Sequence, residues 1–227
     1  MTRIESNLQQ VRARIAAACQ TSGRNVTDVA LLAVSKTFSA ADIRAAWQAG
    51  QRAFGENYIQ EGVDKQAELA DLPIEWHCIG PIQSNKTRQV AEHFDWAHTI
   101  DRLRIARRLS SQRPEQLPPL QICLQINIDG GPNKSGVAPD DALELARAVA
   151  ELPRLRLRGL MAIPEPAPDF DTTLAVHQRM KALLDQLRGE GLALDTLSLG
   201  MSADLEAAIA AGSTLVRVGS AIFGERL

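Results

Sequence analysis

The chain has 227 residues, 45% hydrophobic and 23% charged, and a formal net charge of −2. The length suits one large or two small domains, and the composition is typical of a globular protein with a buried core. No basic excess points to nucleic acid or a membrane surface, and no apolar run reaches the roughly 20 residues that span a bilayer. Three widely spaced cysteines fit no zinc site and indicate reduced thiols in a cytoplasmic protein.

The first predicted element is an N-terminal helix within residues 1–22. Ile4, Leu8, Val11 and Ile15 recur at helical spacing, and the polar character of the segment is unlike a signal peptide.

Eight short β-type runs follow, separated by amphipathic segments. The runs are VALLAVS (29–35), RAFG (52–55), IEWHCIG (74–80), DWAHTI (95–100), LQICLQINI (120–128), LRLRGLMAI (155–163), TLSLG (196–200) and TLVRVG (214–219). Helices are expected at 39–49, 140–152 and 170–189, with Ser39 and Asp140 as N-caps. The charged run RLRIARRL (102–109) is expected to be the solvated face of a further helix.

Alternating strands and helices predict a parallel sheet covered by helices. About eight repeats in this length favour a single (β/α)8 TIM-type barrel preceded by the N-terminal helix. The alternative is a doubly wound open sheet, which usually has fewer strands and a phosphate loop after the first one. No GxGxxG follows the first run, and no linker divides the chain, so residues 1–227 are expected to form one domain.

One lysine, Lys36, ends the first apolar run in LLAVSKT. A lysine at a strand end is usually just solvated. In a barrel, however, active sites lie at the C-terminal ends of the strands, so Lys36 is expected to point into the mouth beside Asn57 and His77. Nearby Glu56 is expected to pair with a cation in a structural role.

Two Gly/Ser loops follow the seventh and eighth runs, where barrels often bind phosphate. Gly200 and Ser202 lie in SLGMSADLEAAI (198–209), and Gly219 and Ser220 lie in VRVGSAIFG (216–224). The plainer alternative is that both loops are ordinary helix caps.

A lysine facing a phosphate site suggests an imine with a phosphorylated aldehyde or ketone. Pyridoxal 5′-phosphate (PLP) and phosphosugars both fit this description. This step needs a neutral amine, and Arg217 is a candidate cation for lowering the pKa of Lys36.

Several longer motifs are more specific than these single residues. LLAVSKT, FGENY, WHCIGPIQSNK, GLMAI, LSLGMSADLEAAI and VRVGSAIFGER resemble the pyridoxal phosphate homeostasis protein family, over about residues 30–225. Members of that family are similar to the barrel domain of alanine racemase without its second domain. Cys78 and Leu199 depart from the usual motifs, both at apolar positions.

The resemblance implies a PLP site made of Lys36 as the imine-forming lysine, Ser202, Gly219 and Ser220 at the phosphate, Arg217 facing the pyridine nitrogen, Met201 in the pocket lining, and Asn57 and His77 near the cofactor. The implied function is intracellular PLP storage, buffering or delivery, with little or no catalysis. PLP-dependent apoenzymes are the further partners that such a role suggests, and no metal, nucleic acid or membrane is expected.

Two alternatives are enzymatic. An amino-acid racemase needs one base on each face of the substrate α-carbon, and this chain has a single tyrosine, Tyr58, and no second domain to supply the other base. A Schiff-base aldolase would need an acid/base set around a polyhydroxylated substrate, which the motifs do not favour. An arginine at position 217 cannot accept a proton and leaves the ring nitrogen a poor electron sink, which disfavours transamination and decarboxylation and suits either racemisation or storage of PLP.

Overall fold

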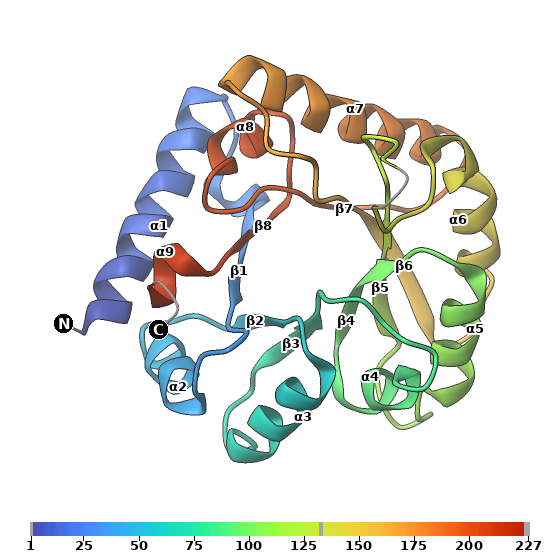
Figure 1. Cartoon of the computed structure of the whole chain (residues 1–227), viewed down its shortest axis with the longest axis horizontal. Coiled ribbons are helices and arrows are strands. Elements are labelled where there is room, and N and C mark those ends of the chain that lie inside the picture. Colours follow the sequence, from blue (N-terminus) through green and yellow to red (C-terminus); the bar gives the residue numbers. More distant parts are fainter. Residues whose placement is uncertain (1, 132–133, 225–227) are drawn as a thin grey trace.

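Eight parallel strands close into a barrel in the computed structural model, which describes residues 2–131 and 134–224 (Figure 1). The strand order follows the chain, and β1 pairs with β8 to close the ring. The strands are β1 (Ala30–Val34), β2 (Ala53–Glu56), β3 (Glu75–Cys78), β4 (Trp96–Ile100), β5 (Leu120–Gln125), β6 (Leu155–Met161), β7 (Thr196–Ser198) and β8 (Leu215–Val218). Each lies on one of the predicted runs, and the (β/α)8 barrel is confirmed.

Helices surround the barrel and alternate with the strands. They are α1 (Arg3–Thr21), α2 (Ala40–Gln48), α3 (Ile59–Glu68), α4 (Thr87–His93), α5 (Leu103–Gln112), α6 (Ala142–Ala150), α7 (Phe170–Gly189), α8 (Leu205–Ala210) and α9 (Ser220–Phe223), with 3₁₀ turns at Val26–Asp28 and Pro139–Asp141. Ser39 caps α2 as expected, because its hydroxyl accepts from the N–H of Asp42. The prediction for Asp140 is wrong, since Asp140 lies in a 3₁₀ turn and α6 begins at Ala142.

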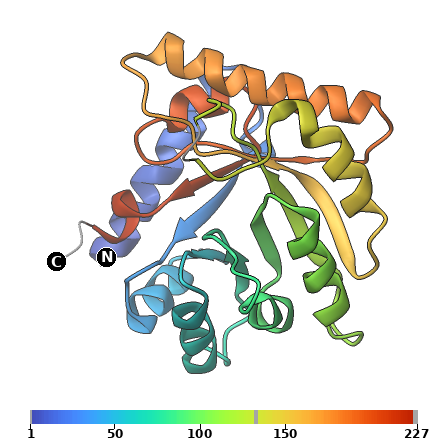
Figure 2. The ribbon, with the colours of Figure 1, turned by 45° about the vertical axis from the view of Figure 1, so that its right-hand side comes forward.

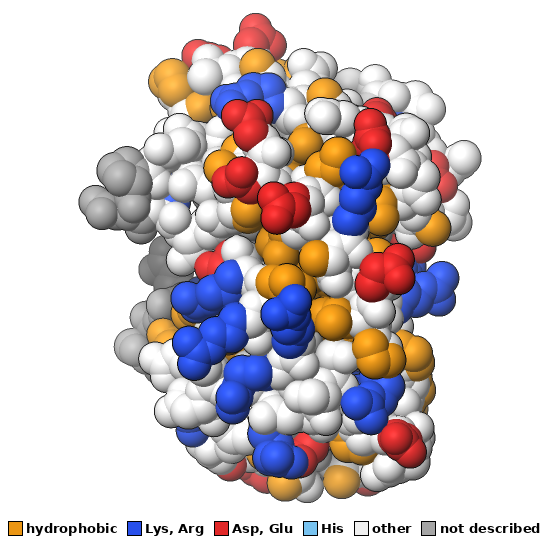
Figure 3. Space-filling view, turned by 90° about the vertical axis from the view of Figure 1, so that its right-hand side faces the viewer, with side chains coloured by type: hydrophobic (Ala, Val, Ile, Leu, Met, Phe, Trp, Pro, Cys, Tyr) orange, Lys and Arg blue, Asp and Glu red, His pale blue; other side chains and the backbone are white. Residues whose placement is uncertain are grey.

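The outer core lies between the barrel wall and the helices. In α5, Ile105, Ala106 and Leu109 are buried, while Arg104 and Arg107 are exposed, so the charged run is the solvated face of a helix. Figure 3 shows Lys and Arg side chains gathered in the lower half of the face that carries this helix.

Within the described part of the chain, no helix combines the length and the apolarity needed to cross a membrane.

Helix α1 lies against α8 and α9, where the chain leaves β7 and β8 (Figure 2). Its apolar stripe is buried, and polar side chains on and just after it donate to main-chain carbonyls of the late elements. Arg3 donates to Phe223 O (3.2 Å), Asn7 to Ile222 O (2.8 Å), Arg14 to Ser202 O (3.0 Å) and Arg24 to Ile209 O (2.7 Å). These contacts hold the loops after the last two strands.

Candidate cofactor site

A cavity of about 540 Å³ lies at the C-terminal ends of the strands. This volume is in the range of small-molecule sites. All of the predicted site residues except His77 line it: Lys36, Asn57, Met201, Ser202, Arg217, Gly219 and Ser220. Apolar side chains, including Val34, Ile79 and Ile163, complete the lining. The fold therefore brings together residues that are up to 184 positions apart in the sequence, from Lys36 to Ser220.

The main chain on both sides of Lys36 is held by buried charges. Ser35 donates its hydroxyl to Glu56 Oε1 (2.6 Å), and Lys65 Nζ donates to Ser35 O (2.8 Å) and to Glu56 Oε1 (2.8 Å). After Lys36, Thr37 has a left-handed backbone (φ 69°), an uncommon conformation for a non-glycine residue. Its N–H donates to Glu61, which also pairs with Lys65 (2.6 Å). These contacts set the direction in which half-buried Lys36 leaves the strand end.

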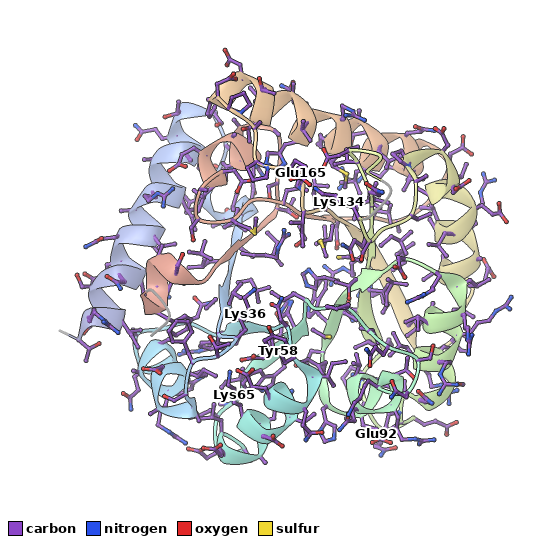
Figure 4. All side chains as sticks on the ribbon, viewed as in Figure 1. Lys36, Tyr58, Lys65, Glu92, Lys134 and Glu165 are labelled. Atoms are coloured by element: carbon purple, nitrogen blue, oxygen red, sulfur yellow. The ribbon has the colours of Figure 1, made fainter. Side chains whose placement is uncertain are left out.

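Glu56 has the structural role that its position suggested. Its side chain is fully buried and pairs with Lys65, which is itself 7% exposed. Burial raises the pKa of the Glu56 carboxyl, and the contacts with Lys65 and Ser35 oppose that rise. Figure 4 shows Lys36 beside β1 and β2 and Lys65 further out, beside α3. Lys65 and Glu61 were not recognised from the sequence, where they are two charged residues of an amphipathic helix.

Arg217 points into the barrel from β8 and is 4% exposed. Its Nη1 donates to Ser198 O (2.7 Å) and Ser198 Oγ (2.8 Å), and its Nη2 donates to Ala162 O (3.0 Å). Burial lowers the pKa of the guanidinium to about 10, so Arg217 still carries its charge at neutral pH. The side chain is thereby fixed in one orientation at the floor of the cavity.

The two Gly/Ser loops meet at the cavity as the barrel geometry requires. Gly200 has a φ of +90°, and a Cβ atom there would lie 2.6 Å from Ala208, so glycine is needed. Asp204 accepts from the N–H of Met201 (2.6 Å) and contacts His177 (2.9 Å), which closes the turn after β7. Burial acts to raise the pKa of Asp204, but these two contacts lower it overall. The N–H groups that begin α9 have no partner within that helix and lie beside the Ser220 hydroxyl.

Asn57 contributes a polar atom that the described protein leaves without a partner. Its Oδ1 is buried and accepts no hydrogen bond from the described residues, although Asn57 lines the cavity. Buried polar atoms are normally hydrogen-bonded, so this amide is suited to a ligand. Gly80 packs directly on the main chain of Asn57, since a Cβ atom at position 80 would come within 2.0 Å of Asn57 O. The glycine of WHCIGPIQSNK therefore has a packing reason.

His77 is the predicted site residue that the cavity does not include. Ile79 lines the cavity, and His77 precedes it by two residues on the same inward face of β3, so its ring lies one layer deeper in the barrel. There it is 1% exposed and hydrogen-bonds to His98 and Glu75. These partners, and Ser198, were not recognised from the sequence. In the sequence they could be identified only by their position in a strand, where the period-two alternation points their side chains into the barrel.

The fold and the cavity define a (β/α)8 barrel protein with a small-molecule site at its C-terminal mouth. Residues 4–227 match the family model described as alanine racemase, N-terminal domain. The pyridoxal phosphate homeostasis protein of Pseudomonas aeruginosa is 59% identical over 226 residues, covering 100% of this chain and 97% of that protein. The chain belongs to the pyridoxal phosphate homeostasis protein family.

Solved structures agree with this assignment. PipY of Synechococcus elongatus PCC7942, solved with PLP bound, is 38% identical, with a TM-score of 0.86 over 97% of this chain and 100% of that one. Alanine racemase from Corynebacterium glutamicum is 18% identical, with a TM-score of 0.68, and covers 99% of this chain but 60% of its own. The second likeness shows the fold alone.

Proposed function

We propose that this protein binds PLP as an imine on Lys36 and serves in intracellular PLP homeostasis, with little or no catalysis. The observation that carries the proposal is that Lys36, Arg217 and residues of two Gly/Ser loops line the same cavity. The names of the relatives and the PLP-bound PipY structure support it. Storage, buffering and delivery to PLP-dependent apoenzymes all fit such a protein.

The residues present fit the functional groups of PLP one by one. The neutral amine of Lys36 would attack the aldehyde carbon, forming the C=N bond as the aldehyde oxygen leaves as water. Ser202, Gly219 and Ser220 would hold the phosphate through hydroxyl and N–H donors. The unpartnered Oδ1 of Asn57 suits the ring hydroxyl, since an amide oxygen can accept its proton. Arg217 would donate to the pyridine nitrogen.

Arg217 also supports the expectation of weak catalysis. Bound PLP supplies an electron sink to amino-acid chemistry when its ring nitrogen is protonated. A guanidinium donates hydrogen bonds and accepts none, so it favours an unprotonated ring nitrogen. The buried position and the hydrogen bonds of Arg217 keep this donor in place.

Amino-acid racemisation is the second candidate function, because the fold is shared with alanine racemase. A racemase needs a second base opposite the lysine. The only tyrosine of the chain, Tyr58, is 57% exposed and does not line the cavity. This arrangement favours a binding role over racemisation.

Borohydride reduction of the PLP-treated protein, followed by peptide mapping, tests the imine. We expect visible absorption that reduction removes, and a pyridoxyl group on Lys36. Lys36→Ala should abolish both signals, whereas Lys181→Ala, which removes an exposed lysine of α7, should change neither. Labelling confined to Lys86 or Lys134 would contradict the assignment of Lys36.

Incubation of the PLP-loaded protein with L-alanine and other amino acids in deuterated water tests the absence of catalysis. We expect deuterium uptake at Cα and D-isomer formation no faster than with free PLP. D-isomer formed at on the order of 1 s⁻¹ or faster, and lost in Lys36→Ala, would establish a racemase instead.

A further inference from the structure

A continuous row of polar side chains crosses the barrel interior below the cavity. Starting from Arg217 Nη1, the contacts run to Ser198 Oγ (2.8 Å), from Ser198 Oγ to His98 Nδ1 (3.1 Å), from His98 Nε2 to His77 Nδ1 (2.9 Å), and from His77 Nε2 to Glu75 Oε1 (2.8 Å). We call these five residues the interior relay. It joins strands β8, β7, β4 and β3, and none of its links is needed to close the sheet.

The interior relay is buried except at its Glu75 end. His77, His98, Ser198 and Arg217 are between 0% and 4% exposed. The Glu75 side chain is 52% exposed and lines a second cavity, of about 280 Å³, at the N-terminal ends of the strands. The His77 ring stacks on Trp96, with 5.2 Å between centroids and 7° between planes, which fixes the plane of the ring. The geometry of each link is therefore held by the surrounding barrel.

With both histidines neutral, the two ends decide the direction of every hydrogen bond. An arginine only donates and an ionised carboxylate only accepts. Ser198 Oγ therefore accepts from Arg217, and its own proton is donated to the lone pair of His98 Nδ1. His98 must then carry its proton on Nε2 and donate it to His77 Nδ1, and His77 must carry its proton on Nε2 and donate it to Glu75. In this arrangement each link has one donor and one acceptor, and both histidines are neutral with the same tautomer.

Arg217 depends on this direction for its orientation. Its bonds to Ser198 O, Ser198 Oγ and Ala162 O use three of the five N–H donors of a guanidinium, which leaves Nε–H and one Nη2–H. If the His98 tautomer were reversed, Ser198 would have to accept from both neighbours and its hydroxyl proton would lose its acceptor. The contact between Ser198 Oγ and Arg217 would then weaken, and the guanidinium would depend mainly on the carbonyl oxygens of Ser198 and Ala162.

We propose that His98, His77 and Glu75 are positioning residues that hold Arg217 as the donor to the ring nitrogen of bound PLP. The inference rests on the proposed function, because it takes the ring nitrogen to face Arg217. The carboxylate of Glu75 accepts the proton of His77 Nε2, and this contact orients each further hydrogen bond along the row up to Ser198 and Arg217. The relay thus acts on the cofactor ring without touching it.

Histidine side-chain NMR on the protein without PLP tests the first half of the proposal. The chain has four histidines, so His77 and His98 can be identified from the signals lost in His77→Gln and His98→Gln. At a pH above the titration of free histidine, we expect both rings to carry a single proton on Nε2. A proton on Nδ1 of either ring would overturn the relay, whatever the protein binds.

A comparison of PLP with its 1-deaza analogue, in which CH replaces the ring nitrogen, tests the second half. The protein should bind PLP about ten- to hundredfold more tightly than the analogue, as expected for one hydrogen bond from a charged donor. His98→Phe should remove most of this preference, and Glu75→Gln, which keeps an acceptor but loses the charge, should reduce it. His98→Gln, which offers one acceptor and one donor, should retain it. His93→Gln changes an exposed histidine of α4 and should have no effect.

The outcomes separate the relay from the proposed function. Failure of the unmodified protein to bind either ligand would reject PLP binding itself. PLP binding with no preference over the analogue, or with the same preference in His98→Phe and Glu75→Gln, would reject the relay and leave PLP binding intact. Glu75 is half-exposed, so Glu75→Gln provides this test even where the buried His98→Phe change prevents folding.

Discussion

Two basic residues that line the cavity, Lys36 and Arg217, are positioned by different kinds of contact. Around Lys36, buried charges fix the main chain of its neighbours: Lys65 and Glu56 hold Ser35, and Glu61 holds Thr37. Around Arg217, the side chain itself is fixed, by carbonyl oxygens and by Ser198. The difference matches the two proposed tasks. A lysine that forms a covalent bond depends on the direction in which its main chain presents it, whereas an arginine that orients a ring depends on a fixed guanidinium.

The strongest way to break this comparison is to remove the buried charge beside Lys36. Lys65→Met should destabilise the protein by about 3–5 kcal/mol, because it leaves the Glu56 carboxylate buried without its cation. Urea unfolding measures this loss. Arg44→Met, which removes the cation of the exposed Arg44–Asp71 pair, is the matched control and should cost far less, because exposed ion pairs contribute little to stability. Equal losses in the two variants would show that burial of the charges is not what matters.

The two Gly/Ser loops, which we propose hold the phosphate, provide a second test. Their hydroxyls should affect ligand affinity and not the positioning of Lys36 or Arg217. Ser202→Ala and Ser220→Ala should each weaken PLP binding by about 1.5–3 kcal/mol, the worth of a hydrogen bond to a charged group. Affinity for unphosphorylated pyridoxal should barely change, and both affinities can be measured by titration. Equal losses for the two ligands would place the phosphate elsewhere.

Lowering the pH should destabilise the protein through His98, on the Arg217 side of the site, before most carboxylates are protonated. Burial, reinforced by the charge of Arg217, lowers the pKa of His98 well below its usual value of 6.5. As the pH falls below about 6.5, His98 binds a proton in the unfolded chain but not in the folded protein. The free energy of unfolding therefore decreases by about 1.4 kcal/mol per pH unit. Denaturant unfolding between mildly alkaline and mildly acidic pH measures the slope. His98→Gln, which cannot titrate, should show a shallower loss, and an unchanged slope would contradict this account.

The smallest effect is expected at the link between α1 and the loop after β7. Arg14 donates to Ser202 O and pairs with Glu206, with both side chains partly exposed. Arg14→Gln should cost about 0.2–1 kcal/mol in stability, as for other exposed pairs, with a change in PLP affinity of no more than a few-fold. Titration with PLP measures the second value. A loss as large as that of Ser202→Ala would show that Arg14 governs the phosphate loop.

The fold could be predicted because local and global signals agree. Apolar runs such as VALLAVS and TLVRVG read as buried parallel strands, and eight of them leave few closed arrangements. The strand-end rule then placed Lys36, Ser202 and Ser220 at one mouth, and the motifs pointed to the same residues. The capping prediction for Asp140 failed because Pro139 opens a 3₁₀ turn first.

The interior of the site could not be predicted in the same way. His77 was expected beside the cofactor, but its depth depends on the period-two alternation of β3, counted back from Ile79. The contact between His98 and Ser198 joins residues 100 positions apart, and it exists only because both strands aim these side chains at one point in the barrel. The left-handed backbone of Thr37 likewise leaves no pattern in the sequence, because threonine seldom adopts it.

Helix α1 has a consequence for the order in which the site forms during synthesis. Its contacts with Ser202, Ile222 and Phe223 span 188, 215 and 220 residues, so α1 leaves the ribosome long before the groups it will hold. Until β7 and β8 have been made, its apolar stripe has no partner among α8 and α9. A nascent chain that stops short of residue 220 lacks α9 and the end of the loop that carries Ser220, so the lining of the cavity is complete only when synthesis has nearly finished.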